Sequence, residues 1–337
     1  MTKKRFLIVL WLTGRCNLNC RYCYASENCA KNDMAFETAR LVIDKLRNEP
    51  LKIQFAGGEP MLNFGLAERV CEYVSEEGID AVFQMQTNGI LIDKLSARKI
   101  KKLNISVGVS LDGVPEVNEL TRGKSGAAID GIRCLAEENI IIGINSVVTS
   151  KNVNRLYELA DLALYLGNVG GIGLDLLRKA GNALNNYSDL RPDPEQIRNA
   201  LIKLAERAAY IHDISGKKIE IREIEKAGRL LRTAENKDGY CYASCGRSLV
   251  VLPDGSLYPC GSLLNKKYCM GSAAAFEAKA ITPVKSGKTD KCSYCRFEKF
   301  CAGGCPSRRI RNEDELDCVL MKTAFELAER NYCADLN

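Results

Sequence analysis

Histidine and tryptophan are almost missing from this chain. Among its 337 residues there is a single histidine, His212, and a single tryptophan. His212 lies in a predicted helix beside Tyr210 and Ile211, and we interpret it as a surface or packing residue. General base catalysis by histidine is therefore close to excluded.

Long apolar runs and long basic blocks are also absent. The apolar stretch from Phe6 to Leu12 is too short to cross a membrane, and no small-residue cleavage site follows it. The hydrophobic content is 46%, the charged content is 27%, and the formal net charge is +6 with both signs interspersed. We therefore predict a cytoplasmic protein that binds neither membrane nor nucleic acid and is long enough for two domains.

Cysteine, in contrast, is abundant, with sixteen residues. In a reducing cytoplasm they are better interpreted as ligands than as disulfides. Cys16, Cys20 and Cys23 follow the first apolar run within eight residues. Three thiolates at this spacing can hold three corners of an iron-sulfur cubane and leave one iron open. The spacing alone also allows a structural zinc loop or ordinary buried thiols.

The first half of the chain alternates apolar strands with amphipathic helices. Strands are predicted at residues 5–12, 51–56, 81–87, 105–111, 140–148 and 172–177. Helices are predicted at residues 34–48, where Asp33 is the expected cap, and at 66–77, 94–102, 127–138 and 153–166. The alternation predicts an α/β fold with a parallel sheet, either open or curled into a partial (β/α)6 TIM-type barrel. The strands are near-continuously apolar, which predicts a sheet covered by helices.

Polar and glycine residues gather where the predicted strands end. They follow the first four strands, at residues 16–23, 57–60, 87–89 and 110–113. Parallel barrels build their sites on this face. Gly57 and Gly58 would let the backbone approach a ligand closely, and Glu59 offers a carboxylate to an ammonium group. An ordinary turn is the alternative for this segment.

Together, the Cys-x3-Cys-x2-Cys loop and Gly57-Gly58-Glu59-Pro60 resemble the radical S-adenosylmethionine (radical SAM) enzymes. The resemblance implies that Cys16, Cys20 and Cys23 hold a [4Fe-4S] cluster whose fourth iron binds S-adenosylmethionine. It further implies these contacts: Gly57, Gly58 and Glu59 with the methionine amino group, Ser110 and Asn145 with the ribose and nearby polar atoms, and Arg122 with the carboxylate. Ala56 departs from the glutamine that some peptide-modifying relatives have there.

The same resemblance implies the reaction. An electron, supplied by a reduced flavodoxin or ferredoxin, cleaves S-adenosylmethionine to a 5′-deoxyadenosyl radical, which takes a hydrogen atom from an unactivated carbon. The cofactor carries this chemistry, while the protein supplies geometry, tuning of the potential and exclusion of water.

The C-terminal part of the chain is rich in cysteine and poor in regular periodicity. Two amphipathic helical segments, 182–216 and 217–232, with a turn at residues 191–194 starting the first, lead to it. A hairpin around Pro253-Asp254-Gly255 is expected to deliver Cys260. Metal binding, by iron-sulfur clusters or by zinc, is predicted for this region. Its cysteines are Cys241, Cys245, Cys260, Cys269, Cys292, Cys295, Cys301, Cys305, Cys318 and Cys333.

This region resembles the SPASM domain, which in many radical SAM enzymes carries two auxiliary [4Fe-4S] clusters. The resemblance implies three clusters in all. The inner auxiliary cluster would be held by Cys241, Cys245, Cys260 and Cys305, with Cys269 as a competitor of Cys241. The outer one would be held by Cys292, Cys295, Cys301 and Cys318. We expect a partial barrel at residues 1–185, a helical bridge at 186–235 and the SPASM domain at 236–337.

Auxiliary clusters suggest oxidative chemistry, because they can accept the electron that a substrate radical must lose. We therefore predict a peptide or protein maturase that forms a thioether or another crosslink, or oxidises a side chain. Gly261 stands where sulfatase-maturing relatives have an aspartate, which disfavours formylglycine formation. No leader-binding domain is expected ahead of the first strand, so the substrate would dock directly or be presented by a separate recognition protein.

Two other hypotheses remain. One is oxidation of a small molecule or cofactor precursor, such as a tetrapyrrole or a sugar. The other is a non-catalytic iron-sulfur electron carrier or zinc scaffold. Of the unassigned cysteines, Cys71 and Cys134 are expected in the core, and Cys29 and Cys269 are candidates to approach the substrate.

Overall fold

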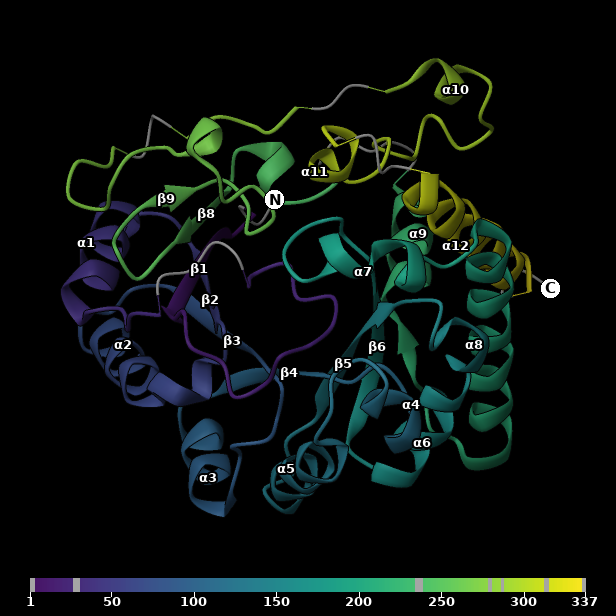
Figure 1. Ribbon diagram of the computed structural model, residues 1–337, viewed down its shortest axis with the longest axis horizontal. Coiled ribbons are helices and arrows are strands. Elements are labelled where there is room, and N and C mark those ends of the chain that lie inside the picture. Colours follow the sequence, from purple (N-terminus) through teal and green to yellow (C-terminus); the bar gives the residue numbers. More distant parts are fainter. Residues whose placement is uncertain are drawn as a thin grey trace.

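A nine-stranded, mostly parallel sheet organises the molecule. The computed structural model describes residues 4–26, 31–233, 239–277, 281–285, 288–311 and 315–334. The strands lie in the order β7-β6-β5-β4-β3-β2-β1-β8-β9 (Figure 1). The first six follow the chain and pair in parallel: β1 Phe6–Thr13, β2 Leu51–Gly57, β3 Ala81–Thr87, β4 Ile105–Ser110, β5 Ile142–Val148 and β6 Val169–Leu176. The α/β fold with sequential parallel strands is confirmed.

Helices connect the successive strands and cover the outer face of the sheet (Figure 1). They are α1 Phe36–Leu46, α2 Phe64–Glu76, α3 Lys94–Lys102, α4 Pro115–Glu119, α5 Ser125–Glu137 and α6 Glu158–Leu166. The predicted cap of the first helix is wrong. Helix α1 has Ala35 at its cap position and no side-chain capping bond. The Asp33 carboxylate instead accepts bonds of 2.6 and 2.9 Å from Arg15, because a paired guanidinium is a stronger partner than a helix N-terminus.

Strands β2 and β5 alternate in burial, contrary to the expectation of a sheet covered on both faces, whereas β1 and β6 contain runs of buried residues. In β2, Ile53 and Phe55 are completely buried under the helices, whereas Lys52 and Gln54 on the other face are half-buried. Strand β5 shows the same pattern, with Ile144 buried and Asn145 half-buried. The reason is that helices cover one face only. The inner face therefore keeps polar and small side chains and is free to bind ligands.

The segment after β6 forms two helices and a strand before α9. It contains α7 Ala183–Leu190, α8 Pro194–Ser215, the short strand β7 Glu220–Ile221 and α9 Arg222–Arg232. The predicted single helix at 182–216 is thus divided. Asp193 caps α8 by accepting a 2.8 Å bond from the Glu195 backbone, and Pro194 starts the helix, so the turn separates two helices. Strand β7 pairs in parallel with β6.

The cysteine-rich region extends the same sheet. The predicted hairpin is present as β8 Ser248–Val251 and β9 Leu257–Tyr258, and β8 pairs in parallel with β1. From there the chain crosses the molecule through α10 Asp290–Ser293 and α11 Pro306–Arg309 to α12 Glu315–Ala334 (Figure 1). Helix α12 is joined to α8 by a 2.6 Å ion pair between Arg198 and Glu326.

The region after α9 shares one hydrophobic cluster with the barrel, including Leu249, Leu257 and Phe325. The predicted domain boundary at residues 235–236 lies outside the described residues, and the division into three parts stays a prediction. Among the described residues, no helix combines the length and the apolar character that crossing a membrane requires.

Candidate functional site

The first three cysteines lie in the loop that follows β1. Cys16 is exposed, Cys20 is buried and Cys23 is half-buried. Burial raises the pKa of Cys20 to about 11. Arg122 opposes this rise, and the nearby thiols of Cys23 and Cys16 add to it. The three thiols are therefore close enough to act on one another. Binding of a metal would have to displace their protons.

The glycine pair after β2 lets two loops come into contact. The Gly58 N–H donates to the Thr13 carbonyl and the Glu59 N–H donates to the Arg15 carbonyl, both over 2.9 Å. A Cβ atom on Gly58 would lie 2.1 Å from the Arg15 carbonyl oxygen, and one on Gly57 would lie 2.5 Å from that of Thr13. The glycines are thus needed to hold the cysteine loop against the turn. Their contact with the methionine amino group stays a prediction.

The Glu59 carboxylate ties this turn to the next strand. It accepts hydrogen bonds from the Thr87 hydroxyl at 2.6 Å, the Asn88 backbone at 2.8 Å and the Met61 backbone at 3.1 Å. The Asn88 side chain in turn donates to Asn17 in the cysteine loop, at 2.7 Å. Burial raises the pKa of Glu59, and these three bonds oppose the rise. Contact of this carboxylate with an ammonium group is untested.

Arg122 brings a positive charge to the cysteine loop. Its guanidinium donates to the Tyr22 hydroxyl at 2.6 Å, and Tyr22 donates to the Asp112 carboxylate at 2.5 Å. Asp112 is completely buried and also accepts a 2.7 Å bond from Thr121. Burial would lower the pKa of Arg122, but Tyr22, Cys20 and Asp112 raise it, so the group stays charged. An anchored cation here suits the predicted binding of a carboxylate.

A row of hydrogen bonds crosses the inner face of the sheet. Gln86 donates to Ser110 at 2.9 Å and accepts from Asn145 at 2.5 Å, and Asn145 accepts from Arg222 at 2.9 Å. A Cβ atom on Gly108 would lie 2.5 Å from the Gln86 amide oxygen, so this glycine gives the row its space. The two predicted residues, Ser110 and Asn145, are thus brought together.

The sequence did not predict that Gln86 and Arg222 belong to this row of hydrogen bonds. The alternation of polar and apolar residues along β3 could have pointed to Gln86. Nothing in the local sequence marks Arg222, because its place depends on how α9 returns to the sheet.

The predicted inner ligands come together from separate segments. The pKa of Cys241 is raised by burial and by the thiols of Cys260 and Cys305, and the Cys245 sulfur lies 3.2 Å from the Cys241 carbonyl oxygen. Cys269 instead lies 3.7 Å from the Gly271 carbonyl oxygen. This arrangement favours Cys241 over Cys269 as the fourth member of the group.

Two arginines face the Cys305 thiol. Burial would raise the pKa of this thiol, but Arg178 and Arg308 lower it below its usual value. Arg308 is itself buried and forms a 2.8 Å ion pair with Asp317. Both arginines were missed in the sequence, since only the folded chain brings them to Cys305.

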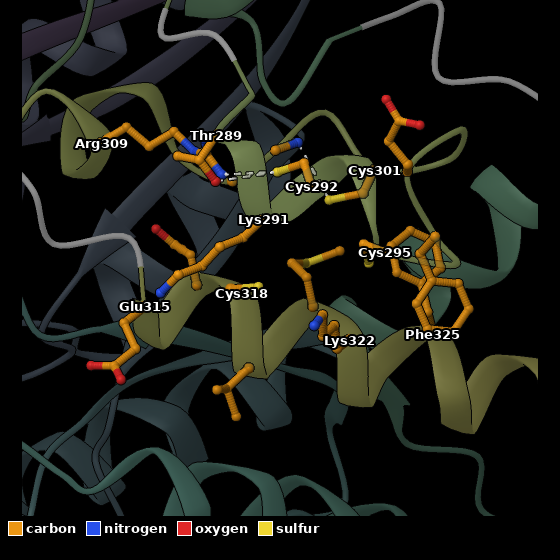
Figure 2. A pocket seen from close by; sticks show the side chains of 17 residues that line it. Thr289, Lys291, Cys292, Cys295, Cys301, Arg309, Glu315, Cys318, Lys322 and Phe325 are labelled. Carbon is orange, nitrogen blue, oxygen red and sulfur yellow. Dashed lines mark hydrogen bonds between the residues drawn. The ribbon is translucent and has the colours of Figure 1, made fainter.

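The predicted outer ligands line a single cavity. Figure 2 shows Cys292, Cys295, Cys301 and Cys318 around a space of about 210 Å³. A water molecule takes up about 30 Å³ in the liquid, so the space is several times larger than one ion needs. The Arg309 guanidinium donates to the Cys292 sulfur over 3.7 Å.

The donor set suits an iron-sulfur cluster. In the part of the chain that the structure describes, no three His, Cys, Asp or Glu side chains converge as a single ion requires. A cubane places its cysteines on different irons, so they stand further apart than ligands of one zinc ion. Four soft thiol ligands around an enlarged cavity therefore fit a cluster.

The remaining cysteines have simpler roles. Cys71 is buried in the core, where burial raises its pKa to about 12, and Cys134 packs against the same core. The core position predicted for Cys71 is confirmed, whereas Cys134 is only half-buried. Cys29 lies outside the described residues, and so does the side chain of Cys333.

Sequence relatives of the chain include characterised enzymes. An uncharacterized protein of Methanocaldococcus jannaschii is 36% identical over 83% of this chain and 92% of the relative. The Fe-coproporphyrin III synthase of Methanosarcina barkeri is 38% identical, over 48% of this chain and 42% of that enzyme. The cysteine-type anaerobic sulfatase-maturating enzyme of Clostridium perfringens is 26% identical over 96% of this chain and 95% of that enzyme.

Solved structures share the fold. The enzyme anSMEcpe with bound AdoMet and Cp18Cys peptide superposes with a TM-score of 0.81 at 21% identity, over 98% of this chain and 99% of that one. SuiB of Streptococcus suis bound to precursor peptide SuiA superposes with a TM-score of 0.69 at 18% identity, over 91% of this chain and 73% of SuiB. The model of the Radical SAM superfamily matches residues 12–163. This chain belongs to the radical SAM superfamily of enzymes.

Proposed function

We propose that this enzyme oxidatively modifies a ribosomally made peptide or protein, using two auxiliary [4Fe-4S] clusters beside the radical SAM cluster. The observation that carries the proposal is the position of Arg178. Its guanidinium lies 3.9 Å from the Cys305 sulfur and 6.0 Å from the ring of Tyr24, the residue after Cys23. The inner cysteine group and the first cysteine loop therefore border the same space.

The residues of the barrel bind and orient the cofactor in this proposal. The bound cluster and S-adenosylmethionine supply a radical that removes a hydrogen atom from the substrate. Arg122 holds the methionine carboxylate, Ser110 and Asn145 hold the ribose, and the Gly57 turn faces the amino group. Buried anchors such as Asp112 keep these groups in place before the cofactor arrives.

A peptide substrate is supported by the relatives that match over nearly the whole chain. The sulfatase-maturating relative matches 96% of it, and both structural neighbours described above have a bound peptide. The formylglycine reaction itself is disfavoured. Gly261 has no carboxylate where the sulfatase-maturing relatives have an aspartate. A Cβ atom at this position would lie 3.5 Å from Trp11 and 3.8 Å from the Tyr24 hydroxyl, so the position is beside the first cysteine loop.

A second candidate substrate is a small molecule with carboxylate groups, such as a tetrapyrrole precursor. The match to the Fe-coproporphyrin III synthase favours it. Three arginines near the inner face also favour it. Arg222 lies 3.7 Å from Asp175. Burial would raise the pKa of Asp175, but Arg222, Arg178 and Arg308 lower it. A guanidinium group such as that of Arg178 could bind a carboxylate of an anionic substrate.

The test is anaerobic purification followed by iron analysis and a substrate panel. Three clusters require about twelve irons per chain. About four irons would contradict the two auxiliary clusters. The reduced enzyme is then incubated with S-adenosylmethionine and either a short cysteine-containing peptide or a tetrapyrrole precursor that carries carboxylate groups. We expect the peptide to lose hydrogen, detected by mass spectrometry, and a change in the tetrapyrrole alone would favour the second candidate.

A further inference from the structure

Arg178 lies at the junction between the barrel and the cysteine-rich region. It follows β6, whereas its partners Cys305 and Ser307 lie at the start of α11, far along the chain (Figure 1). Its guanidinium is 3.1 Å from the Ser307 hydroxyl, which in turn lies 3.1 Å from the Cys305 sulfur. The sulfur therefore faces both a cation and a hydroxyl group.

The charge of Arg178 is not cancelled by a carboxylate in contact with it. Among the described residues, no Asp or Glu oxygen lies within ion-pair distance of its guanidinium. Asp175, which lies 3.7 Å from Arg222, is still near enough to raise the pKa of Arg178. The neighbouring cation, Arg308, is in contrast neutralised by Asp317, with both side chains almost completely buried. Of the two arginines near Cys305, Arg178 is therefore the one without an ion pair among the described residues.

A positive charge and a hydrogen bond at a ligand sulfur both raise the reduction potential of an iron-sulfur cluster. Reduction of an iron-sulfur cluster adds one negative charge. Hydrogen bonds to its sulfurs and nearby cations stabilise this charge more than they stabilise the oxidised form. The effect is strong in a protein interior, because the low dielectric weakens charges less than water does. Arg178 and Ser307 should both raise the reduction potential of a cluster held by Cys305.

We propose that Arg178 is a positioning residue that raises the reduction potential of the inner auxiliary cluster, so that this cluster accepts the electron from the substrate radical. The inference rests on the proposed function, which supplies the cluster. In the step concerned, one electron would leave the substrate radical, which is oxidised, and enter the cluster, which is reduced. The oxidised substrate would then lose a proton to solvent to give the product, and the outer auxiliary cluster would take the electron from the inner one.

The measurement is a redox titration of the anaerobic holoenzyme followed by electron paramagnetic resonance. Addition of S-adenosylmethionine identifies the signal of the first cluster, and the two others are assigned to the auxiliary clusters. We expect Arg178→Met to lower the potential of one auxiliary signal and to leave the other unchanged. Ser307→Ala should lower the same potential by less, and Arg178→Lys, which keeps the charge, should stay nearest to the wild-type value.

Arg309→Met is the matched control, because Arg309 contacts Cys292 in the outer group. This variant should lower the reduction potential of the other auxiliary cluster and leave unchanged the potential that Arg178→Met lowers. If both auxiliary potentials stay unchanged in Arg178→Met, the inference is wrong. Should that variant lose iron, Ser307→Ala decides: an unchanged potential overturns the inference, and a lowered one supports it.

The iron content separates the two possible failures. About twelve irons per chain with unmoved potentials would overturn the role of Arg178 and leave the proposed function standing. About four irons per chain would overturn both, because no auxiliary cluster would be present.

Discussion

The barrel and the cysteine-rich region are stabilised in different ways. In the barrel, the cysteine loop is held by backbone hydrogen bonds and by buried side chains such as Glu59 and Asp112. In residues 239–311, helices and strands are short, and the candidate ligands come from separate segments. We therefore propose that the barrel forms its site by packing, whereas the second region depends on the proposed auxiliary clusters to be complete.

Removal of iron should have the largest effect and should affect the two regions unequally. We expect chelation under anaerobic, reducing conditions to unfold residues 288–311 while β1 to β6 stay protected, because that segment contains only two four-residue helices and the strands share a packed core. Hydrogen–deuterium exchange with mass spectrometry would detect the difference. Equal loss of protection in both regions would show that the comparison is wrong.

Gly58→Ala should have the next largest effect, on the barrel alone. Its Cβ atom would lie 2.1 Å from the Arg15 carbonyl oxygen, so the cysteine loop must move. We expect a loss of about 1–3 kcal/mol in the free energy of unfolding, measured by urea denaturation. Gly65→Ala is the matched control, since nothing lies within 4 Å of the added atom, and it should be neutral or stabilising by about 0.5–1 kcal/mol. Equal effects of the two variants would contradict this account of the turn.

Arg122→Gln should weaken cofactor binding without loosening the cysteine-rich region. Loss of a charge-assisted bond costs about 1.5–3 kcal/mol, which corresponds to a dissociation constant for S-adenosylmethionine raised by roughly 10- to 150-fold. Equilibrium dialysis of the anaerobic holoenzyme would measure it. Arg133→Gln, which alters an exposed arginine, is the control and should bind as the wild type does. An unchanged affinity in Arg122→Gln would remove Arg122 from the cofactor site.

Asp33→Asn should have the smallest effect, and a pH-dependent one. A bond from Thr13 and the contact with Arg15 lower the pKa of Asp33, with burial opposing them. A lowered folded-state pKa adds stability above the ordinary value of the carboxyl group, and this stability is lost as the pH falls through the folded-state value. Both side chains of the pair are nearly half exposed, so the loss at neutral pH should stay below about 1 kcal/mol. Urea denaturation at pH 7 and at pH 3 would show whether the difference from wild type narrows in acid.

The sequence predicted the barrel better than the network inside it. The order of strands and helices was predictable because apolar periodicity is a local property, and the short spacing of Cys16, Cys20 and Cys23 shows their grouping directly. The Gln86–Asn145–Arg222 row depends on the register of β3, β4 and β5 and on the return of α9. No local pattern encodes that geometry.

The contacts of the cysteine-rich region were the hardest to predict. The resemblance to the SPASM domain pointed to the two ligand groups, but not to Arg178 and Arg309, which come to Cys305 and Cys292 only through the folded chain. The alternation along the strands was misjudged for a related reason. Residues such as Val82 are apolar yet exposed on the inner face, so composition alone hides which side of the sheet is open.

The most direct test of the central claim is cleavage of S-adenosylmethionine by the reduced, iron-loaded enzyme. We predict that the wild type releases 5′-deoxyadenosine even without substrate, quantified by liquid chromatography and mass spectrometry. The variant with Cys16, Cys20 and Cys23 all replaced by alanine should release none while keeping about eight irons per chain. Intact S-adenosylmethionine in the wild type, or equal cleavage by the variant, would contradict the account.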